Sequence, residues 1–366
     1  MLRSGPGSGA GVSRGDENAS NPFRSVLKGL RHRLRTAWRR RRFAARLRHL
    51  HGPRRLESGP EEVILIALVR DGSYYLDAFF DHYRAMGIRH FVFIDNGSTD
   101  DTIARIKAEP GTVIDQCDLP LARYEDLIRG WPAMTYGRDR WCLYVDMDEM
   151  FDFEGREVLG IEGLVRYLDA GGYTALVAQM LEMFPKAPLS AVARLPYDAV
   201  LREFVYFDLS HVDRRAYHDP DIDFSGLLAQ NTLSNPEVEV AFGGVRAKVF
   251  GEACCLTKHP LIFNGPDVVP GLHPHVSTGV HCADFTALIR HYKFANDPAG
   301  RDAASVARED LAHGEDTLGA RRLSAGPGAR LFSLDARRWN RIELLYRAGF
   351  LTGSAGFSDH AKRRAG

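Results

Sequence analysis

Residues 63–95 read VILIALVRDGSYYLDAFFDHYRAMGIRHFVFID, and this stretch decides the fold. It opens with Val63–Val69, an unbroken apolar run typical of a strand that is buried on both faces of a sheet. Apolar residues then recur at helical spacing over 75–86, and Gly87 ends that helix. His90–Ile94 is a second β-branched and aromatic run. The order strand, helix, strand predicts a βαβ unit.

The same alternation continues on the C-terminal side of this unit. The sequence predicts strands over 112–114, 141–145 and 173–180, and helices over 121–139 and 157–170. Strands that alternate with helices at this spacing are typical of a parallel sheet. We therefore expect an α/β fold with a doubly wound, mainly parallel sheet and helices on both faces. Later elements are predicted as short strands over 245–250 and 261–263 and a last helix over 337–350.

Length and composition exclude several classes of protein. The chain has 366 residues, of which 45% are hydrophobic and 26% charged, as in ordinary globular proteins. The longest apolar run has seven residues, whereas a spanning helix needs about 20. We see no secretory signal, and five irregularly spaced cysteines predict neither a disulfide scaffold nor a zinc site. We expect a cytoplasmic protein.

The net charge of +1 hides a strong asymmetry. Residues 1–60 contain 14 Arg and one Lys against three acids, a net charge of +12, so the remaining 306 residues carry −11. Within residues 23–50, apolar side chains such as Leu34 and Trp38 recur on one helical face among the basic residues. This pattern favours peripheral binding to an anionic membrane at its inner face. Binding to nucleic acid, docking on the acidic body and a solvated extension remain alternatives.

These features divide the chain into three parts. Residues 1–60 form a basic, helical N-terminal arm, of which 1–22 contain few apolar residues and are predicted to be disordered. Residues 61–300 form the α/β domain. Residues 301–366 form a C-terminal helical extension, in which 300–330 are predicted to be loop or mobile helix and the residues after 350 a polar tail.

Polar residues follow three of the predicted strands. They are Arg70-Asp71-Gly72, Asp95-Asn96-Gly97-Ser98 and Asp146-Met147-Asp148-Glu149. Ligands of open α/β sheets bind at the carboxyl ends of the strands, so we expect these residues at one edge. The second of the three is also explained by a plain turn.

The third group is the richest in charge. Three acids in four residues after a buried strand repel one another at low dielectric. A divalent cation would relieve that repulsion, and oxygen ligands suit Mg²⁺ or Mn²⁺, which commonly also bind substrate phosphates. A solvated acidic turn is the alternative.

Six short elements, taken in order, make the chain similar to a known family. They are Val69–Leu76 with Asp81–Ile88, Ile94–Asp100, Asp146–Phe151, Gly243–Phe250, Lys258–Leu261 and His291–Phe294. Together they resemble a bacterial branch of the family 2-like glycosyltransferases, which have the GT-A fold, over about residues 60–296. Arg70-Asp71-Gly72 stands where many relatives have Asn-Glu.

The resemblance implies transfer of a sugar from a nucleotide diphosphate donor to a saccharide or lipid-linked acceptor, with inversion and with Mn²⁺ or Mg²⁺. It implies that Asp95 binds the nucleoside, that Asp148 binds the metal and that Asp146 contacts the ribose or the metal. His291 is our candidate for an added metal ligand. The candidate donor-binding residues are Arg70, Asp71, Asp95, Asn96, Asp146, Arg246, Lys248 and Lys293.

The general base is less narrowly defined. Candidates are Glu149 beside the acidic turn and the acids of the loop-rich stretch 185–240, with Asp208 and Asp213 preferred. Two other functions compete with glycosyl transfer. A nucleotidyltransferase would need a basic triphosphate loop after its first strand, which Arg70-Asp71-Gly72 matches poorly. A nucleic-acid-binding protein would use the arginine-rich arm, but its acidic body would repel phosphates.

Overall fold

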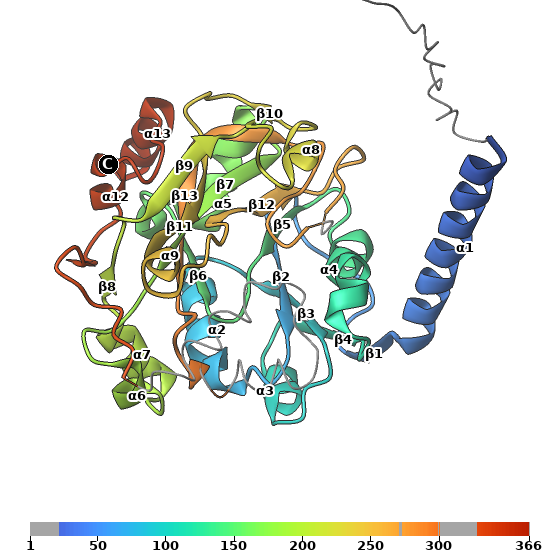
Figure 1. The fold of residues 1–366 in the computed structure, drawn as a ribbon, viewed down its shortest axis with the longest axis horizontal. Coiled ribbons are helices and arrows are strands. Elements are labelled where there is room, and N and C mark those ends of the chain that lie inside the picture. The colour runs from blue at the N-terminus through green and yellow to red at the C-terminus, as the bar shows by residue number, and fades with distance from the viewer. Residues whose placement is uncertain (1–21, 271–272, 299, 301–327, 366) are drawn as a thin grey trace, which may run out of the picture. The chain divides into compact units, whose positions relative to one another are not determined.

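The computed structural model describes residues 22–270, 273–298, 300 and 328–365 (Figure 1). Contacts divide the chain into two units, Met1–Ala44 and Ala45–Gly366, which we describe separately. The long helix α1 (Pro22–Arg46) contains all the described residues of the first unit. No helix of the described residues is long and apolar enough to cross a membrane.

The second unit is built on a ten-stranded sheet in the order β1-β4-β3-β2-β5-β12-β7-β13-β10, with β6 paired to β13. The inner strands β2, β3, β4 and β5 are parallel to one another, and β7, β13 and β10 form a second parallel group. Strand β12 lies between β5 and β7 and is antiparallel to both, and β1 and β6 also pair antiparallel. The strands are β1 (Arg48–His51), β2 (Ile64–Val69), β3 (His90–Asp95), β4 (Thr112–Gln116), β5 (Trp141–Tyr144), β6 (Glu149–Asp152), β7 (Ala175–Glu182), β10 (Thr232–Leu233), β12 (Thr257–Phe263) and β13 (His281–His291).

Helices cover both faces of this sheet because its strands are apolar on both sides. Leu65 and Ala67 of β2 belong to the same buried cluster as apolar residues of α2 and α5, whereas Ile64 and Ile66 belong to a second cluster with residues of α4. The helices among the described residues of this unit are η1 (Ser73–Tyr75), α2 (Leu76–Ala85), α3 (Thr102–Ala108), α4 (Leu121–Tyr136), α5 (Arg156–Ala170), α6 (Leu189–Val192), α7 (Tyr197–Glu203), α8 (Ser225–Leu228), α9 (Gly244–Phe250), α12 (Glu343–Arg347) and α13 (Ala355–Ala365). The α/β class and the two-sided, mainly parallel sheet are confirmed.

Two short antiparallel ribbons complete the unit. One joins β9 (Val212–Ala216) to β11 (Glu239–Gly243), and the other joins β8 (Tyr206–Phe207) to β14 (Arg337–Arg338). The first ribbon leads directly into α9. It therefore connects the loop-rich stretch of the sequence to the edge of the sheet where the candidate site lies.

Three local predictions were wrong. Residues 245–250 form helix α9 instead of a strand, because Gly243 and Gly244 have positive φ values of 87° and 63° and turn the chain sharply after β11. The helix expected over 337–350 is reduced to α12, since Arg337 and Arg338 pair with β8. The tail beyond it forms α13 and buries Phe357, because an aromatic face there packs on α5 and β13.

The N-terminal prediction also needs correction. Residues 48–51, which we expected in the basic arm, form β1 and pair with β4 at the edge of the sheet. His49 on this strand forms a 2.9 Å hydrogen bond with the buried carboxylate of Asp115, and this contact joins the strand to β4. The predicted disorder of residues 1–22 and the loop prediction for 300–330 fall mostly outside the described residues.

Candidate functional site

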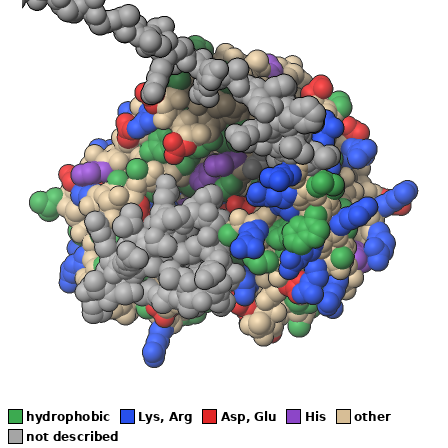
Figure 2. All heavy atoms as spheres, turned by 45° about the vertical axis from the view of Figure 1, so that its right-hand side comes forward, with side chains coloured by type: hydrophobic (Ala, Val, Ile, Leu, Met, Phe, Trp, Pro, Cys, Tyr) green, Lys and Arg blue, Asp and Glu red, His purple; other side chains and the backbone are tan. Residues whose placement is uncertain are grey.

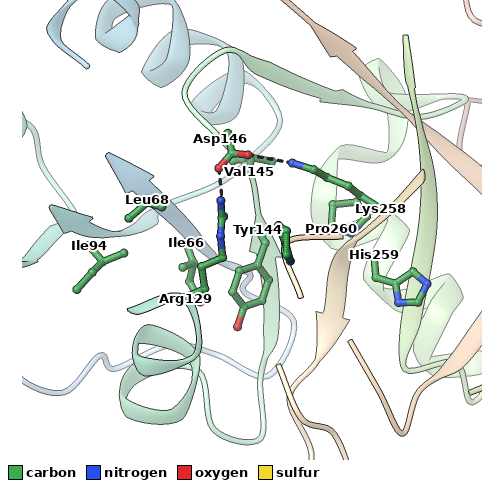
Figure 3. Close-up of a pocket in the computed structure, with 11 residues that line it drawn as sticks. Ile66, Leu68, Ile94, Arg129, Tyr144, Val145, Asp146, Lys258, His259 and Pro260 are labelled. Carbon is green, nitrogen blue, oxygen red and sulfur yellow. Dashed lines mark hydrogen bonds and ion pairs between the residues drawn. The ribbon is translucent and has the colours of Figure 1, made fainter. Parts of the chain in front are cut away.

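A cavity of about 870 Å³ opens at the carboxyl end of β5. Its lining comes from the turn after β5, the β9–β11 ribbon, α9, β12 and the end of β13. Figure 2 shows a hollow on this face with histidine and acidic side chains inside it. A small pocket of about 20 Å³ adjoins the cavity and shares Arg129, Asp146 and Lys258 with it (Figure 3). The arrangement follows the rule that ligand sites of α/β sheets lie at strand ends.

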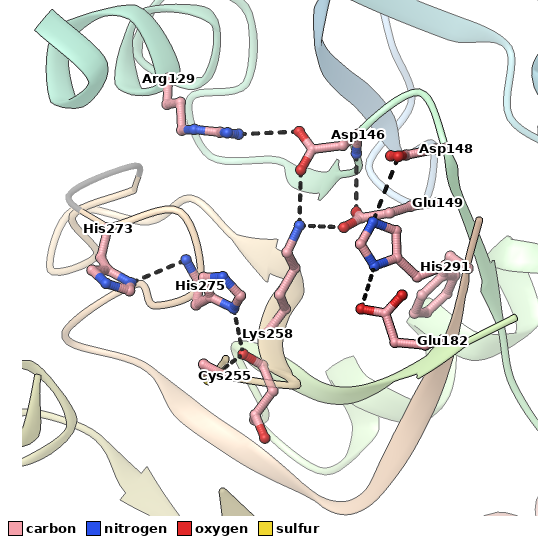
Figure 4. Close-up of polar contacts among 12 residues, drawn as sticks. Arg129, Asp146, Asp148, Glu149, Glu182, Cys255, Lys258, His273, His275 and His291 are labelled. Atoms are coloured by element: carbon pink, nitrogen blue, oxygen red, sulfur yellow. Dashed lines mark hydrogen bonds and ion pairs between the residues drawn. The ribbon is translucent and has the colours of Figure 1, made fainter. Parts of the chain in front are cut away.

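The acidic turn after β5 is neutralised by two cations of the chain (Figure 4). Lys258 Nζ lies 3.0 Å from Asp146 Oδ2 and also contacts Glu149 Oε1, while Arg129 reaches Asp146 Oδ1 at 3.3 Å. The second oxygen of Glu149 accepts a 3.0 Å hydrogen bond from the Asp146 amide. Charge relief, which the sequence led us to assign to a metal, therefore comes from Arg129 and Lys258 for Asp146 and Glu149.

Burial and charge set the pKa values of this network. Lys258 is nearly buried, and its two carboxylate partners outweigh desolvation and raise its pKa, so it stays protonated. Lys258 and Arg129 in turn hold the pKa of Asp146 well below its usual range. Desolvation raises the pKa of Glu149, whose side chain is 1% exposed, although Lys258 opposes this effect.

Asp148 belongs to a second chain of contacts. His291 Nε2 lies 3.6 Å from Asp148 Oδ2, and His291 Nδ1 lies 3.2 Å from Glu182 Oε1. Strand register creates this arrangement, because His291 on β13 pairs with Glu149 of β6 on one side and with Glu182 of β7 on the other. The two carboxylates outweigh desolvation and raise the pKa of His291 to about 10.

Within this second set of contacts, Asp148 and His291 are the side chains that could offer ligands to a divalent cation. The described residues contain no group of three or more His, Cys, Asp or Glu side chains that could hold a metal ion. Asp148 and His291 offer one oxygen and one nitrogen, and Mg²⁺ commonly takes its other ligands from water and phosphate. Glu182 would orient His291 from behind, as carboxylates do for metal-binding histidines. His291 must lose a proton before Nε2 can bind a metal. Asp146 fits less well, because both of its oxygens are engaged by cations.

The described lining of the cavity carries a small excess of negative charge. It contains seven carboxylates, against five Arg or Lys side chains and the protonated His291. A nucleoside diphosphate would add further negative charge to this excess. A bound divalent cation would offset that charge, which favours metal-assisted binding of such a ligand.

The residues after β2 and β3 form hydrogen bonds that stabilise neighbouring turns. The carboxylate of Asp95 is buried and accepts hydrogen bonds from the Gly97 and Ser98 amides and from Gln116 Nε2. Asn96 donates to the carbonyls of Cys117 and Leu119. These contacts match the plain-turn alternative for this segment.

Asp71 extends the same bracing to the first loop. Its carboxylate accepts hydrogen bonds from the amides of Thr99 and Asp100, and its own amide donates to Ser98 Oγ. Arg70, Asp71, Asp95 and Asn96 are not among the residues that line the cavity in the described part of the chain.

The other predicted residues separate into two groups. Asp213, Arg246 and Lys293 line the cavity, with Asp213 3.0 Å from Arg215 and Arg246 2.7 Å from Glu252. Asp208 and Lys248 instead pair with each other at 2.7 Å, away from the lining. Lys248 also contacts Asp335, so this pair ties α9 to the C-terminal segment.

Sequence reasoning missed three residues of the site: Arg129, Glu182 and the cationic role of Lys258. Arg129 lies on the helix predicted over 121–139, for which we named no site residue, and Glu182 follows an apolar run in the same way as the acids after β5. An acid directly after a buried strand was therefore a usable signal for Glu182. Lys258 belongs to one of the family-like elements, but its partners lie more than 100 residues away in the chain.

Comparison with known proteins assigns no family to the chain. No family model matches the chain, and no curated protein matches it significantly.

Proposed function

We propose that this protein is a glycosyltransferase that moves a sugar from a nucleotide diphosphate donor to a saccharide or lipid-linked acceptor. The observation that carries the proposal is the acidic turn 146–149 at a strand end, beside an 870 Å³ cavity in which Asp148 faces His291. The six family-like elements of the sequence support the same function. Four of them, around Asp146, Arg246, Lys258 and His291, supply residues that line this cavity.

In this proposal the residues divide the work as follows. Asp148 and His291 would hold Mn²⁺ or Mg²⁺, which when bound neutralises the diphosphate leaving group. Lys258 and Arg129 hold Asp146 and Glu149 in place and keep the turn rigid. Arg246 and Lys293 offer positive charge on another part of the lining.

The same geometry narrows the choice of general base. Glu149 is enclosed by Lys258 and the Asp146 amide, and Asp208 lies outside the lining, so neither has access to an acceptor hydroxyl. Asp213 is exposed and lines the cavity. Asp221 and Asp223 of the same stretch are also exposed and line the cavity, so the candidate bases for the acceptor hydroxyl are Asp213, Asp221 and Asp223.

A ligand screen tests the donor class. We expect one of the UDP, GDP, CMP or dTDP sugars to raise the melting temperature in the presence of Mn²⁺, since a ligand at 100 times its Kd adds about 2.7 kcal/mol. Asp148→Asn should abolish the Mn²⁺-dependent part of this shift and nearly all turnover. Asp198→Asn, in an exposed surface ion pair, is the matched control and should leave both unchanged.

Two outcomes would contradict the proposal. Full turnover of the donor by chelator-treated enzyme would show that the reaction needs no metal ion and would contradict that part of the proposal. Stabilisation by nucleoside triphosphates, with release of pyrophosphate and none by nucleotide sugars, would favour a nucleotidyltransferase instead.

A further inference from the structure

Helix α1 carries an unusual charge for a helix with an apolar stripe. Its 25 residues include ten Arg or Lys and no acid. Leu34 and Trp38, one turn apart on the same side, are 62% and 55% exposed. The guanidinium of Arg42 lies over the Trp38 ring at 5.3 Å. The helix therefore presents an apolar strip that is bordered by arginine.

This combination selects among partners. A nucleic acid would match the positive charge but would leave Leu34 and Trp38 in water. An anionic bilayer matches both features, because apolar side chains enter the acyl boundary while arginine stems reach back to the headgroups. Tryptophan is itself enriched at the membrane interface. Ten cations within 25 residues favour a helix that lies in the interface plane.

We infer that α1 binds the surface of an anionic lipid bilayer, with Leu34 and Trp38 inserted and the arginines on the headgroups. The inference is independent of the proposed activity. It predicts that binding needs both the anionic lipid and the apolar strip. Electrostatic attraction alone would make the strip dispensable.

Sedimentation of the full chain with vesicles tests this. Vesicles of equal parts phosphatidylglycerol and phosphatidylcholine should pellet the protein at low salt, and pure phosphatidylcholine vesicles should not. Binding should fall at about 0.5 M salt, where charges are screened within a few ångströms. Tryptophan emission should shift to the blue on binding, and Trp38→Phe should remove most of that shift.

Paired variants separate insertion from charge. Leu34→Gln with Trp38→Gln keeps the charge and the helix propensity, and should weaken vesicle binding at least about tenfold through loss of apolar burial. Thr36→Ser lies on the opposite side of the helix, roughly 200° from Leu34, and should bind like the parent. Each variant must have the melting temperature of the parent, so that any loss of vesicle binding can be attributed to the changed side chains of α1.

The opposite results are equally clear. Equal pelleting of the parent and the double Gln variant would overturn insertion. No pelleting of the parent, with binding to duplex DNA that the double Gln variant retains, would assign α1 to nucleic acid. Neither vesicle nor DNA binding would leave α1 as a solvated extension or a segment bound to the protein itself, and would also overturn the inference.

Discussion

At the scale of single residues, Lys258 compensates the negative charge of the acidic turn. Its ammonium group is shared between Asp146 and Glu149, and Glu149 is almost completely buried. Removal of one partner from a buried ion pair leaves an uncompensated charge, which costs about 3–5 kcal/mol. Lys258→Met should therefore lower the free energy of unfolding by about 3 kcal/mol in urea denaturation. Lys362→Met, in an exposed surface pair, should change it by less than about 0.5 kcal/mol. Equal effects of both would mean that the Lys258 contacts contribute little.

At the scale of elements, strand β12 carries a histidine that is neutral in the folded protein. His259 is buried, accepts from the Ser277 amide and lies 2.9 Å from the Tyr217 hydroxyl. Desolvation lowers its pKa from 6.5 to about 4. The folded pKa is the lower one, so the stability from His259 is present above pH 6.5 and is lost as the pH falls toward 4. Between pH 7 and 5 this loss is about 2 kcal/mol, and His259→Gln should reduce the pH dependence of unfolding by that amount. From pH 7 to 8 the free energies of unfolding of parent and variant should change with pH in parallel. Equal slopes of the unfolding free energy against pH below pH 6.5 would show that His259 does not titrate on unfolding.

At the scale of the whole molecule, the C-terminal segment completes the core of the second unit. Phe357 of α13 is fully buried and stacks on Phe285 of β13, with ring centroids 3.8 Å apart. Phe357→Ala should lower the free energy of unfolding by about 3–5 kcal/mol, with a single cooperative transition in thermal denaturation. Leu334→Ala, at a fully exposed position, should leave it within about 0.5 kcal/mol. A parent-like melting curve for Phe357→Ala would show that α13 is an appendage.

Local patterns in the sequence determined much of the fold. The apolar run of β2 and the helical spacing of α2 are short-range signals, because burial on both faces or on one stripe dictates which residue types recur. The same logic located the acids after β5 and placed them at the edge of the sheet where the cavity opens. It failed at α9, where two glycines in left-handed conformations override the strand-like composition of the residues that follow.

The charges and partners of the site were decided only by the tertiary structure. β12 enters between β5 and β7 from more than 70 residues away, and this brings Lys258 to Asp146. The pairing of β13 with β6 and β7 places His291 between Asp148 and Glu182. No local propensity encodes such contacts, because strand order and register are set by the packing of the whole sheet. The sequence by itself therefore determined that acids gather at this edge, and the tertiary structure decided which cations meet them, since a side chain's charge partner depends on neighbours that are distant in the chain.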